Sequence, residues 1–206
     1  TIPETVKTIQ DNAFAGCHGL TGRLMIPDSV TEIGQSAFYN CSGFTGLTLS
    51  ENLTTVRYNT FYGCSGVEGQ LIIPDRVVTV EYYAFCGMKH LTSAVIGSNV
   101  ETLNAGTRYG DTTFEGCSSL EEIKFLGTVP PNLSNGTSMF RNLQSLKKIR
   151  VPAGTYQTYM QAYNSYLTDQ ITLLEEGADE FLIRDQVLVS YSGTGTEVQI
   201  PGGVTE

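Results

Sequence analysis

Tryptophan is absent from this chain of 206 residues, and charged side chains make up only 16% of it. Basic residues are fewer than acidic ones: the chain has 12 Lys and Arg and 21 Asp and Glu, which gives a net charge of −9 at pH 7. A protein that binds nucleic acid needs a basic surface that neutralises phosphates, so this balance argues against a nucleic-acid partner. No apolar run approaches the roughly 18 residues that a membrane span needs, so we predict no such span in this sequence.

Residues that carry catalysis are also sparse. The two histidines, His18 and His90, lie far apart in the sequence, and we interpret both as turn residues. Neither belongs to an HExxH sequence, a metal-spaced Cys/His set or a Ser-His-Asp arrangement. Gly193-Thr194-Gly195 lacks the third glycine of a dinucleotide-binding fingerprint and is interpreted as a hairpin turn. We therefore predict that the chain is not an enzyme and binds no cofactor or metal.

Internal repetition is what the sequence has in abundance. A phenylalanine recurs every 23 to 29 residues, at Phe14, Phe38, Phe61, Phe85, Phe114 and Phe140. The clearest copies around it are Ala13-Phe14-Ala15-Gly16-Cys17, Ala37-Phe38-Tyr39-Asn40-Cys41, Thr60-Phe61-Tyr62-Gly63-Cys64 and Thr113-Phe114-Glu115-Gly116-Cys117. An Ile-Pro pair recurs as Ile2-Pro3, Ile26-Pro27, Ile73-Pro74 and Ile200-Pro201. Such regular copies predict a stack of similar structural units.

Each unit also contains a short stretch in which apolar and other residues alternate, such as Ile123-Lys124-Phe125 or Ile149-Arg150-Val151. Alternation of period two turns the first and third side chains into a core and the middle one outward. One coil cannot bury its own apolar face, so stacked coils share a continuous core. We predict about six coils, each made of short strands and a short helical turn that carries the inward phenylalanine.

The unit from Ile26 to Cys41, with the sequence IPDSVTEIGQSAFYNC, resembles the BspA-type leucine-rich repeat. That family is found in surface proteins of mucosal bacteria and some protists, and the resemblance covers roughly residues 1–153. Residues and resemblance together predict an α/β repeat solenoid, a right-handed leucine-rich-repeat superhelix of short strands and short helical turns. The resemblance further implies a secreted or cell-surface location and adhesion to a host or cell-surface protein or glycan. It transfers no ligand-binding residues, because the family's motif residues shape the core.

Three segments are expected along the chain. They are a leucine-rich-repeat array of about six coils at 1–153, a helical cap and linker strand at 154–178, and the β-hairpin opening of a second, truncated repeat module at 179–206. Tyr156, Met160 and Tyr163 follow helical spacing and are expected to cover the open end of the array.

Two coils are lengthened by insertions, within residues 97–113 and 126–139. Insertions in repeat proteins map to loops, often on the binding side. The first residues, Thr1-Ile2-Pro3, look like the middle of a repeat. We therefore interpret the chain as a fragment, with further coils expected upstream of Ile2.

Four of the five cysteines occupy one slot, three residues after the repeat phenylalanine: Cys17, Cys41, Cys64 and Cys117. Met88 and Leu143 fill the same slot in the other coils, which indicates a small apolar core position. Stacked side chains point in parallel, whereas a disulfide needs converging Cβ atoms. We predict free, buried thiols, with a disulfide or metal ladder as the alternative. Cys86 takes a slot that tyrosine holds in other coils, so an exposed position is open to it.

The outward positions of the strands form a candidate binding face. Its proposed residues are Met25, Ile72, Val95, Lys124, Lys148 and Arg150. In the first four coils this face is mostly apolar, and an exposed apolar strip is a candidate contact surface. The alternative is that these residues only pack across the sheet, as β-branched residues favour.

Basic residues gather in 128–167, which hold four of them and no acidic residue. One interpretation is an anchor for an anionic glycan or an acidic protein segment. The other is charge pairing between neighbouring coils, because the repeat alignment stacks Glu115 on Arg141, Glu121 on Lys147 and Glu122 on Lys148. Lys124 stacks on Arg150, like charge on like, and our hypothesis is that this pair meets an anionic group of a partner.

Tyrosines form two further registers, Tyr39 with Tyr62 and Tyr58 with Tyr82. Tyrosine is suited to recognition because it is amphipathic and rigid, but stacking between adjacent coils explains the same pattern. From the sequence, the favoured function is a non-catalytic binding module. The alternative is a passive spacer that presents another domain.

Overall fold

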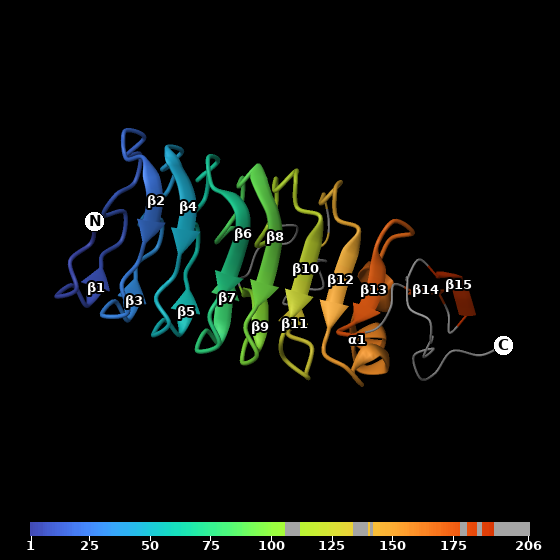
Figure 1. Ribbon diagram of the computed structural model, residues 1–206. Coiled ribbons are helices and arrows are strands. Elements are labelled where there is room, and N and C mark those ends of the chain that lie inside the picture. The colour runs from blue at the N-terminus through green and yellow to red at the C-terminus, as the bar shows by residue number, and fades with distance from the viewer. Residues whose placement is uncertain (106–111, 134–139, 141, 178–180, 185–186, 192–206) are drawn as a thin grey trace.

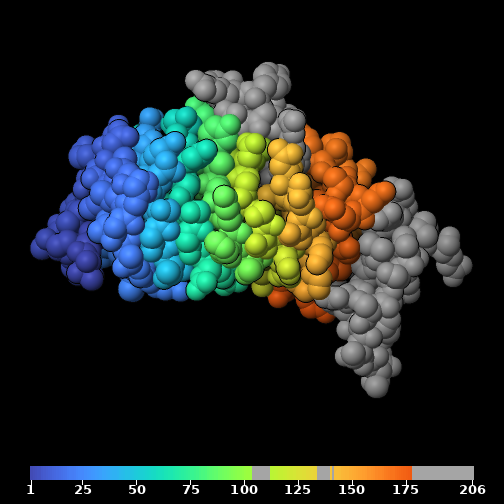
Figure 2. All heavy atoms as spheres, turned by 90° about the horizontal axis from the view of Figure 1, so that it is seen from above, coloured from blue at the N-terminus to red at the C-terminus, as the bar shows by residue number. Residues whose placement is uncertain are grey.

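The chain folds into a solenoid whose coils follow one another in sequence order from the N-terminus (Figure 1, Figure 2). In this computed structural model the described residues are 1–105, 112–133, 140, 142–177, 181–184 and 187–191. Two parallel strand ladders run along the solenoid, one strand of each ladder per coil, and the core lies inside the coils.

The first ladder forms what we call the first sheet face. Its strands are β2 (Gly22–Met25), β4 (Phe44–Thr48), β6 (Glu68–Ile73), β8 (His90–Ile96), β10 (Glu122–Phe125), β12 (Lys148–Val151) and β13 (Thr172–Glu175). The hydrogen-bonded orders are β2-β4 and β6-β8-β10-β12-β13, and β4 lies next to β6. All of the hydrogen-bonded pairs are parallel.

The second ladder forms the second sheet face and is made of shorter strands. They are β1 (Thr8–Ile9), β3 (Glu32–Ile33), β5 (Thr55–Val56), β7 (Thr79–Glu81), β9 (Thr102–Ala105) and β11 (Asn132–Leu133). They pair in parallel as β1-β3 and β5-β7-β9-β11. Parallel strands of consecutive coils need a crossover between them, and the turn segment with the repeat phenylalanine lies in it.

The repeat phenylalanines stack as a column through the core. The ring centroids of Phe14 and Phe38 lie 5.1 Å apart, those of Phe38 and Phe61 5.4 Å, and those of Phe61 and Phe85 5.7 Å. Phe85 and Phe114 continue the column at 5.8 Å. Ring planes tilt by at most 15° between neighbours, so each ring covers the faces of the next. The column confirms the prediction that this residue points inward.

The predicted helical turns around these phenylalanines are wrong. Within the described residues, helix occurs only in α1 (Tyr156–Tyr163) and the 3-10 helix η2 (Asn164–Tyr166). The phenylalanine segments are hydrogen-bonded turns, and their backbone N–H groups reach the next coil, as when Phe38 N donates to the Thr60 carbonyl at 2.9 Å. Left-handed residues four apart, such as Ser36 and Asn40 with φ of 56°, interrupt a helical backbone. The α/β class is therefore not confirmed, and the right-handed sense of the superhelix stays a prediction.

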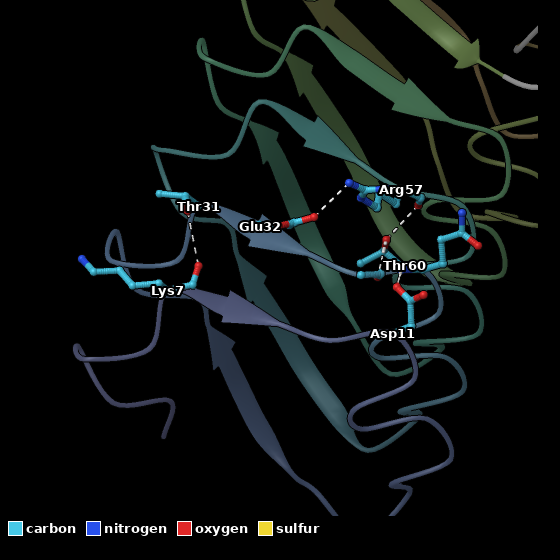
Figure 3. Close-up of polar contacts among 8 residues, drawn as sticks. Lys7, Asp11, Thr31, Glu32, Arg57 and Thr60 are labelled. Carbon is cyan, nitrogen blue, oxygen red and sulfur yellow. Dashed lines mark hydrogen bonds and ion pairs between the residues drawn. The ribbon is translucent and has the colours of Figure 1, made fainter.

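Polar side chains hold adjacent coils together at the turns (Figure 3). The Asp11 carboxylate accepts a hydrogen bond from the backbone N–H of Gln35 in the next coil at 2.7 Å. Arg57 forms an ion pair with Glu32 at 2.9 Å, again across a coil boundary. Every such bond links residues about one repeat apart, so each coil is fixed mainly by its two neighbours.

Helix α1 lies beside β12 and β13 in Figure 1 and packs its tyrosines against the core. Tyr156 and Tyr163 are buried as predicted, but the third buried position is Tyr159, and Met160 is only partly buried. The reason lies in hydrogen bonding: Tyr159 donates its hydroxyl to the Gly127 carbonyl at 2.8 Å. Tyr163 does the same to the Pro131 carbonyl at 2.7 Å, whereas a methionine has no hydroxyl to donate.

The C-terminal part contains an antiparallel pair, β14 (Phe181–Arg184) and β15 (Val187–Tyr191). This pair falls in the segment expected as a hairpin, and its role as the opening of a second module stays a prediction. The interpreted turn at Gly193-Thr194-Gly195 lies outside the described residues, as do 106–111 and 134–139 of the two insertions. The described parts of those insertions contribute β9 and β11 to the second sheet face.

Candidate binding faces

The outward residues of the first sheet face lie in one row across the strands. Met25 pairs with Thr48, and Ile72 pairs with Val95. Lys124 pairs with Val95 on one side and with Arg150 on the other. Lys148 lies in the neighbouring row, where its Cα partners are Glu122 and Thr172. The structure thus brings the six predicted residues together on one face, in the register that the repeats predict.

The apolar part of this row is open to solvent at two positions. Met25 is 62% exposed and Ile72 53%, which are high values for large apolar side chains within strands. Val95 beside Ile72 is half-buried, and Thr48 beside Met25 is exposed. An apolar side chain that projects from a rigid strand offers contact area without a large loss of conformational entropy on binding.

The charged part of the row is balanced within the chain. Lys124 Nζ lies 3.0 Å from Glu176 Oε2, and Arg150 Nε lies 3.3 Å from Glu122 Oε2. Glu176 follows β13, so it comes from outside the two coils that the sequence alignment compared. The repulsion between Lys124 and Arg150 is therefore offset by two carboxylates, and it no longer indicates an anionic partner.

The residues expected to form charge pairs between neighbouring coils are stacked as the alignment predicts, and the pairing itself stays a prediction. Glu122 and Lys148 are Cα partners, although Glu122 forms its ion pair with Arg150. The backbone N–H of Lys147 donates to the Glu121 carbonyl at 2.9 Å. The third expected pair, Glu115 with Arg141, cannot be placed because Arg141 lies outside the described residues.

A shallow groove on the first sheet face was not predicted from the sequence. It has a volume of about 790 Å³ and lies along the starts of β6 and β8, with Glu68, Gln70, His90 and Thr92 among its lining residues. The register of β6 against β8 shifts at Gly69, a left-handed glycine with φ of 79°. Such a bulge re-aims the side chains that follow it. The signal in the sequence is one extra residue between Val67 and Leu71 relative to the next coils.

The two histidines make no common site. His18 lies in a turn as predicted, but His90 opens strand β8, with its Nδ1 at 2.9 Å from the Ser65 carbonyl oxygen. Across the described ranges, no three His, Cys, Asp or Glu side chains gather in a way that could hold a metal ion. No helix in that part of the chain is both long and apolar enough to cross a bilayer.

An apolar hollow of about 1080 Å³ opens at the first coil. Ile9, Phe14, Leu24 and Phe38 are among the residues that line it. These residues belong to the hydrophobic core that continues through the following coils, so we assign the hollow to the core and not to a ligand site.

All five cysteines are free thiols. The thiols of Cys41, Cys64 and Cys117 donate to backbone carbonyls of the preceding coil at 3.0 to 3.3 Å, which fixes them in parallel. This arrangement confirms the prediction for the cysteine slot, although Cys17 in the first coil is only partly buried. Cys86 is buried at 7% exposure, so the expectation of an exposed position is wrong.

Burial raises the pKa of the Cys64 and Cys117 thiols to about 12, mainly because a buried thiolate loses its solvation. A thiol reacts as its thiolate, and at mildly alkaline pH these two groups are almost wholly protonated. We expect a disulfide-exchange reagent to modify Cys17 in the folded protein within minutes and to leave the buried thiols unmodified. Denatured, unreduced protein should titrate five thiols. A Cys17→Ser variant is the control and should lose the fast phase, and a count below five after denaturation would contradict the assignment.

The tyrosine registers stack as the alignment predicts. The ring centroids of Tyr39 and Tyr62 lie 5.0 Å apart, and those of Tyr58 and Tyr82 lie 4.5 Å apart. All four side chains are half-buried, so stacking between coils leaves part of each ring accessible.

The repeat geometry has a counterpart among known protein families. The sequence profile of the BspA-type leucine-rich repeat region, in six copies, matches residues 1–107 and 106–170. The chain belongs to the BspA-type leucine-rich repeat family. Comparison with curated protein sequences found no match.

Solved structures of leucine-rich repeat proteins share the fold. A leucine-rich cell surface protein of Faecalibacterium prausnitzii A2-165 matches 61% of this chain at 29% identity, with a TM-score of 0.54. A leucine-rich repeat protein of T. pallidum matches 73% at 25% identity and a TM-score of 0.54, over 69% of its own length. The pneumococcal vaccine antigen PcpA matches 85% at 21% identity and a TM-score of 0.66, which shows the fold alone. The chain spans 31% of the F. prausnitzii protein and 40% of PcpA.

Proposed function

We propose that this chain is a non-catalytic binding module of a secreted or cell-surface protein, and that it adheres to a host or cell-surface protein or glycan. Membership of the BspA-type family supports this proposal, because its members are generally binding modules. The similar F. prausnitzii protein is described as a cell surface protein, and PcpA as a vaccine antigen, which agrees with an exposed location. No cofactor enters the proposal.

One observation carries the proposal: the exposed apolar row on the first sheet face. Met25 and Ile72 project from parallel strands that are hydrogen-bonded to neighbouring coils, so their positions are fixed before a partner arrives. Burial of such apolar side chains by a partner contributes favourably to the free energy of binding. Val95, Lys124, Lys148 and Arg150 extend the proposed face from β8 to β12.

The charge balance of this face indicates how binding should respond to salt. Lys124 and Arg150 already pair with Glu176 and Glu122, so few unpaired charges are left to attract a partner. We therefore expect the apolar row to dominate and binding to persist at high ionic strength. A screen of this chain against host matrix proteins and mucosal glycans, at low and high salt, identifies the partner.

Ile72→Ser is expected to weaken binding of the partner found in that screen by roughly 10-fold to 100-fold, the effect of leaving one aliphatic side chain out of the interface. The matched control is Val78→Ser, which also removes an exposed aliphatic side chain but lies at the start of the second sheet face. Equilibrium dissociation constants of both variants, measured by surface plasmon resonance, provide the comparison. Equal effects of the two substitutions would contradict binding through the first sheet face, and silence across the screen would favour a passive spacer.

A further inference from the structure

Five tyrosines form a continuous aromatic surface at the turns of three consecutive coils. We call Tyr39, Tyr58, Tyr62, Tyr82 and Tyr83 the tyrosine cluster. In addition to the two stacked pairs, Tyr83 meets Tyr62 edge to face, with centroids 5.9 Å apart and planes at 84°. Tyr83 also lies 5.9 Å from Tyr82 and 6.4 Å from Tyr58. These contacts join the two tyrosine registers into one surface.

The rings of the tyrosine cluster are half-buried, and several of their polar groups are unused. Of the hydrogen bonds between described residues, none involves the hydroxyl of Tyr39, Tyr58, Tyr62 or Tyr82. A tyrosine that only fills a core is usually buried and bonds its hydroxyl within the protein, as Tyr159 and Tyr163 do here. The cluster therefore has the character of a contact surface.

Tyr83 has a strained backbone conformation at the position where its ring joins the tyrosine cluster. Its φ of 59° is left-handed, whereas the equivalent positions of the three preceding coils hold Asn12, Ser36 and Asn59. Asparagine tolerates this conformation, but a bulky aromatic residue in it is an outlier. Its ring bridges Tyr58, Tyr62 and Tyr82, so the fourth coil departs from the repeat at the position that completes the aromatic surface.

The surroundings of the tyrosine cluster are acidic. Glu115 follows Tyr62 and Cys86 in the row of residues that come directly after the repeat phenylalanines. Its Oε2 atom is buried and lacks a hydrogen-bond partner. Backbone hydrogen bonds from Gly63 N to the Cys86 carbonyl at 2.8 Å and from Gly87 N to the Glu115 carbonyl at 2.7 Å place Glu115 in the coil after Cys86. Cys86, burial, and then Tyr39 and Glu115 raise the pKa of the Tyr62 hydroxyl.

Among the described residues around the tyrosine cluster, acidic side chains are in excess. Glu81 ends strand β7 next to Tyr82, and one of its carboxylate oxygens accepts the backbone N–H of Tyr58 at 2.7 Å. The basic neighbour, Arg57, already pairs with Glu32. Aromatic faces carry a negative quadrupole and attract cations, and the negative charge of the Glu115 carboxylate adds to this attraction.

We propose that the tyrosine cluster is a second interaction surface, distinct from the first sheet face, and that it binds a protein segment presenting an arginine side chain. A guanidinium group stacks on tyrosine faces and can donate hydrogen bonds to the phenol oxygens, while the negative charge of Glu115 attracts it. Arginine and tyrosine are both enriched among the residues that dominate protein interfaces. A neutral sugar would leave the carboxylate of Glu115 without a counter-charge, so a cation fits this surface better.

The test uses a rhodamine-labelled Gly-Ser peptide that carries three arginines, and the same peptide with citrulline, which has the shape of arginine without its charge. Fluorescence anisotropy measures the binding of each peptide to the chain at low and at high salt. We expect the arginine peptide to bind at least about 5-fold more tightly than the citrulline peptide, the range of a cation–π contact with a carboxylate nearby. Tyr58→Ala combined with Tyr82→Ala should weaken the arginine peptide by about 5-fold or more.

Glu115→Gln removes one charge, leaves every ring in place and should also weaken the arginine peptide by about 5-fold. This variant keeps the proposal testable if circular dichroism shows that the double tyrosine variant is unfolded. The matched control is Glu51→Gln, which makes the same charge change at an exposed turn after β4 and should leave the affinity within about 2-fold. Ile72→Ser, on the first sheet face, should not change peptide binding.

Three results would overturn the proposal. The first is equal binding of the arginine and citrulline peptides. The second is an equal loss of affinity in Glu115→Gln and Glu51→Gln, because attraction to the net negative chain would then explain the binding. The third is binding of maltohexaose, lost in the double tyrosine variant, without binding of the arginine peptide, which would make a neutral glycan the occupant of the tyrosine cluster.

Discussion

Phe61→Ala is expected to lower the free energy of unfolding by about 3–5 kcal/mol, the usual range for truncating a fully buried phenylalanine. Phe61 has no exposed surface and stacks on Phe38 at 5.4 Å and on Phe85 at 5.7 Å. Its removal leaves a cavity in the middle of the phenylalanine column and breaks two ring contacts. Neighbouring coils cannot close the gap, because their spacing is fixed by two strand ladders.

The control for this prediction is Phe14→Ala in the first coil. Phe14 is only partly buried and has one ring neighbour, Phe38 at 5.1 Å. The same substitution should therefore cost less than half as much there. Urea unfolding followed by circular dichroism measures both values, and equal losses in the two variants would show that the column does not stabilise the coils as a stack.

Gly97→Ala is expected to destabilise the fold by about 2–3 kcal/mol, although it adds only one methyl group. A Cβ atom at this position would lie 2.5 Å from the carbonyl oxygen of Pro74 and 2.8 Å from that of Ile73. Both atoms belong to the backbone of the preceding coil, so no side-chain rotation can relieve the overlap. The coils would have to separate locally, and hydrogen bonds between β6 and β8 would lengthen.

Gly19→Ala is the matched control for Gly97→Ala, since nothing lies within 4 Å of a Cβ atom at Gly19. Thermal unfolding should leave this variant close to the wild-type transition, within about 0.5 kcal/mol. If Gly97→Ala were equally well tolerated, the close approach of consecutive coils would not be required for stability.

Most of the core could be predicted from the sequence, because each core position recurs as an apolar residue in several coils. Phe38, Phe61 and Phe85 share a slot with apolar residues in other coils, so periodicity alone places them inside. The conformation of the turn segments, helical or not, could not be predicted in the same way. Whether a short apolar segment becomes a helix or a turn depends on where its N–H groups bond, and in this fold they bond to the next coil.

The errors at the candidate sites also have physical causes. The repeat alignment correctly stacked Lys124 on Arg150. It did not include Glu176, which follows the strand after α1 and forms an ion pair with Lys124. Cys86 occupies a position that tyrosine holds in other coils. The repeat alignment therefore did not predict that the Cys86 side chain is buried. The exposed positions of Met25 and Ile72 followed from strand alternation, a local property, and were predicted in full.

Helix α1 affects how the solenoid responds to a pulling force. The strands lie across the long axis in Figure 1, so tension along that axis loads the ladder between two coils directly. Terminal coils would then separate from the array one after another, because each separation breaks only the hydrogen bonds to one neighbouring coil. The hydroxyl groups of Tyr159 and Tyr163 reach back 32 residues, to Gly127 and Pro131, and so join the last coils. Tension from the C-terminal side first separates β13 from β12 and must then break these two hydrogen bonds. Helix α1 therefore makes the coils before β13 separate together and not one by one.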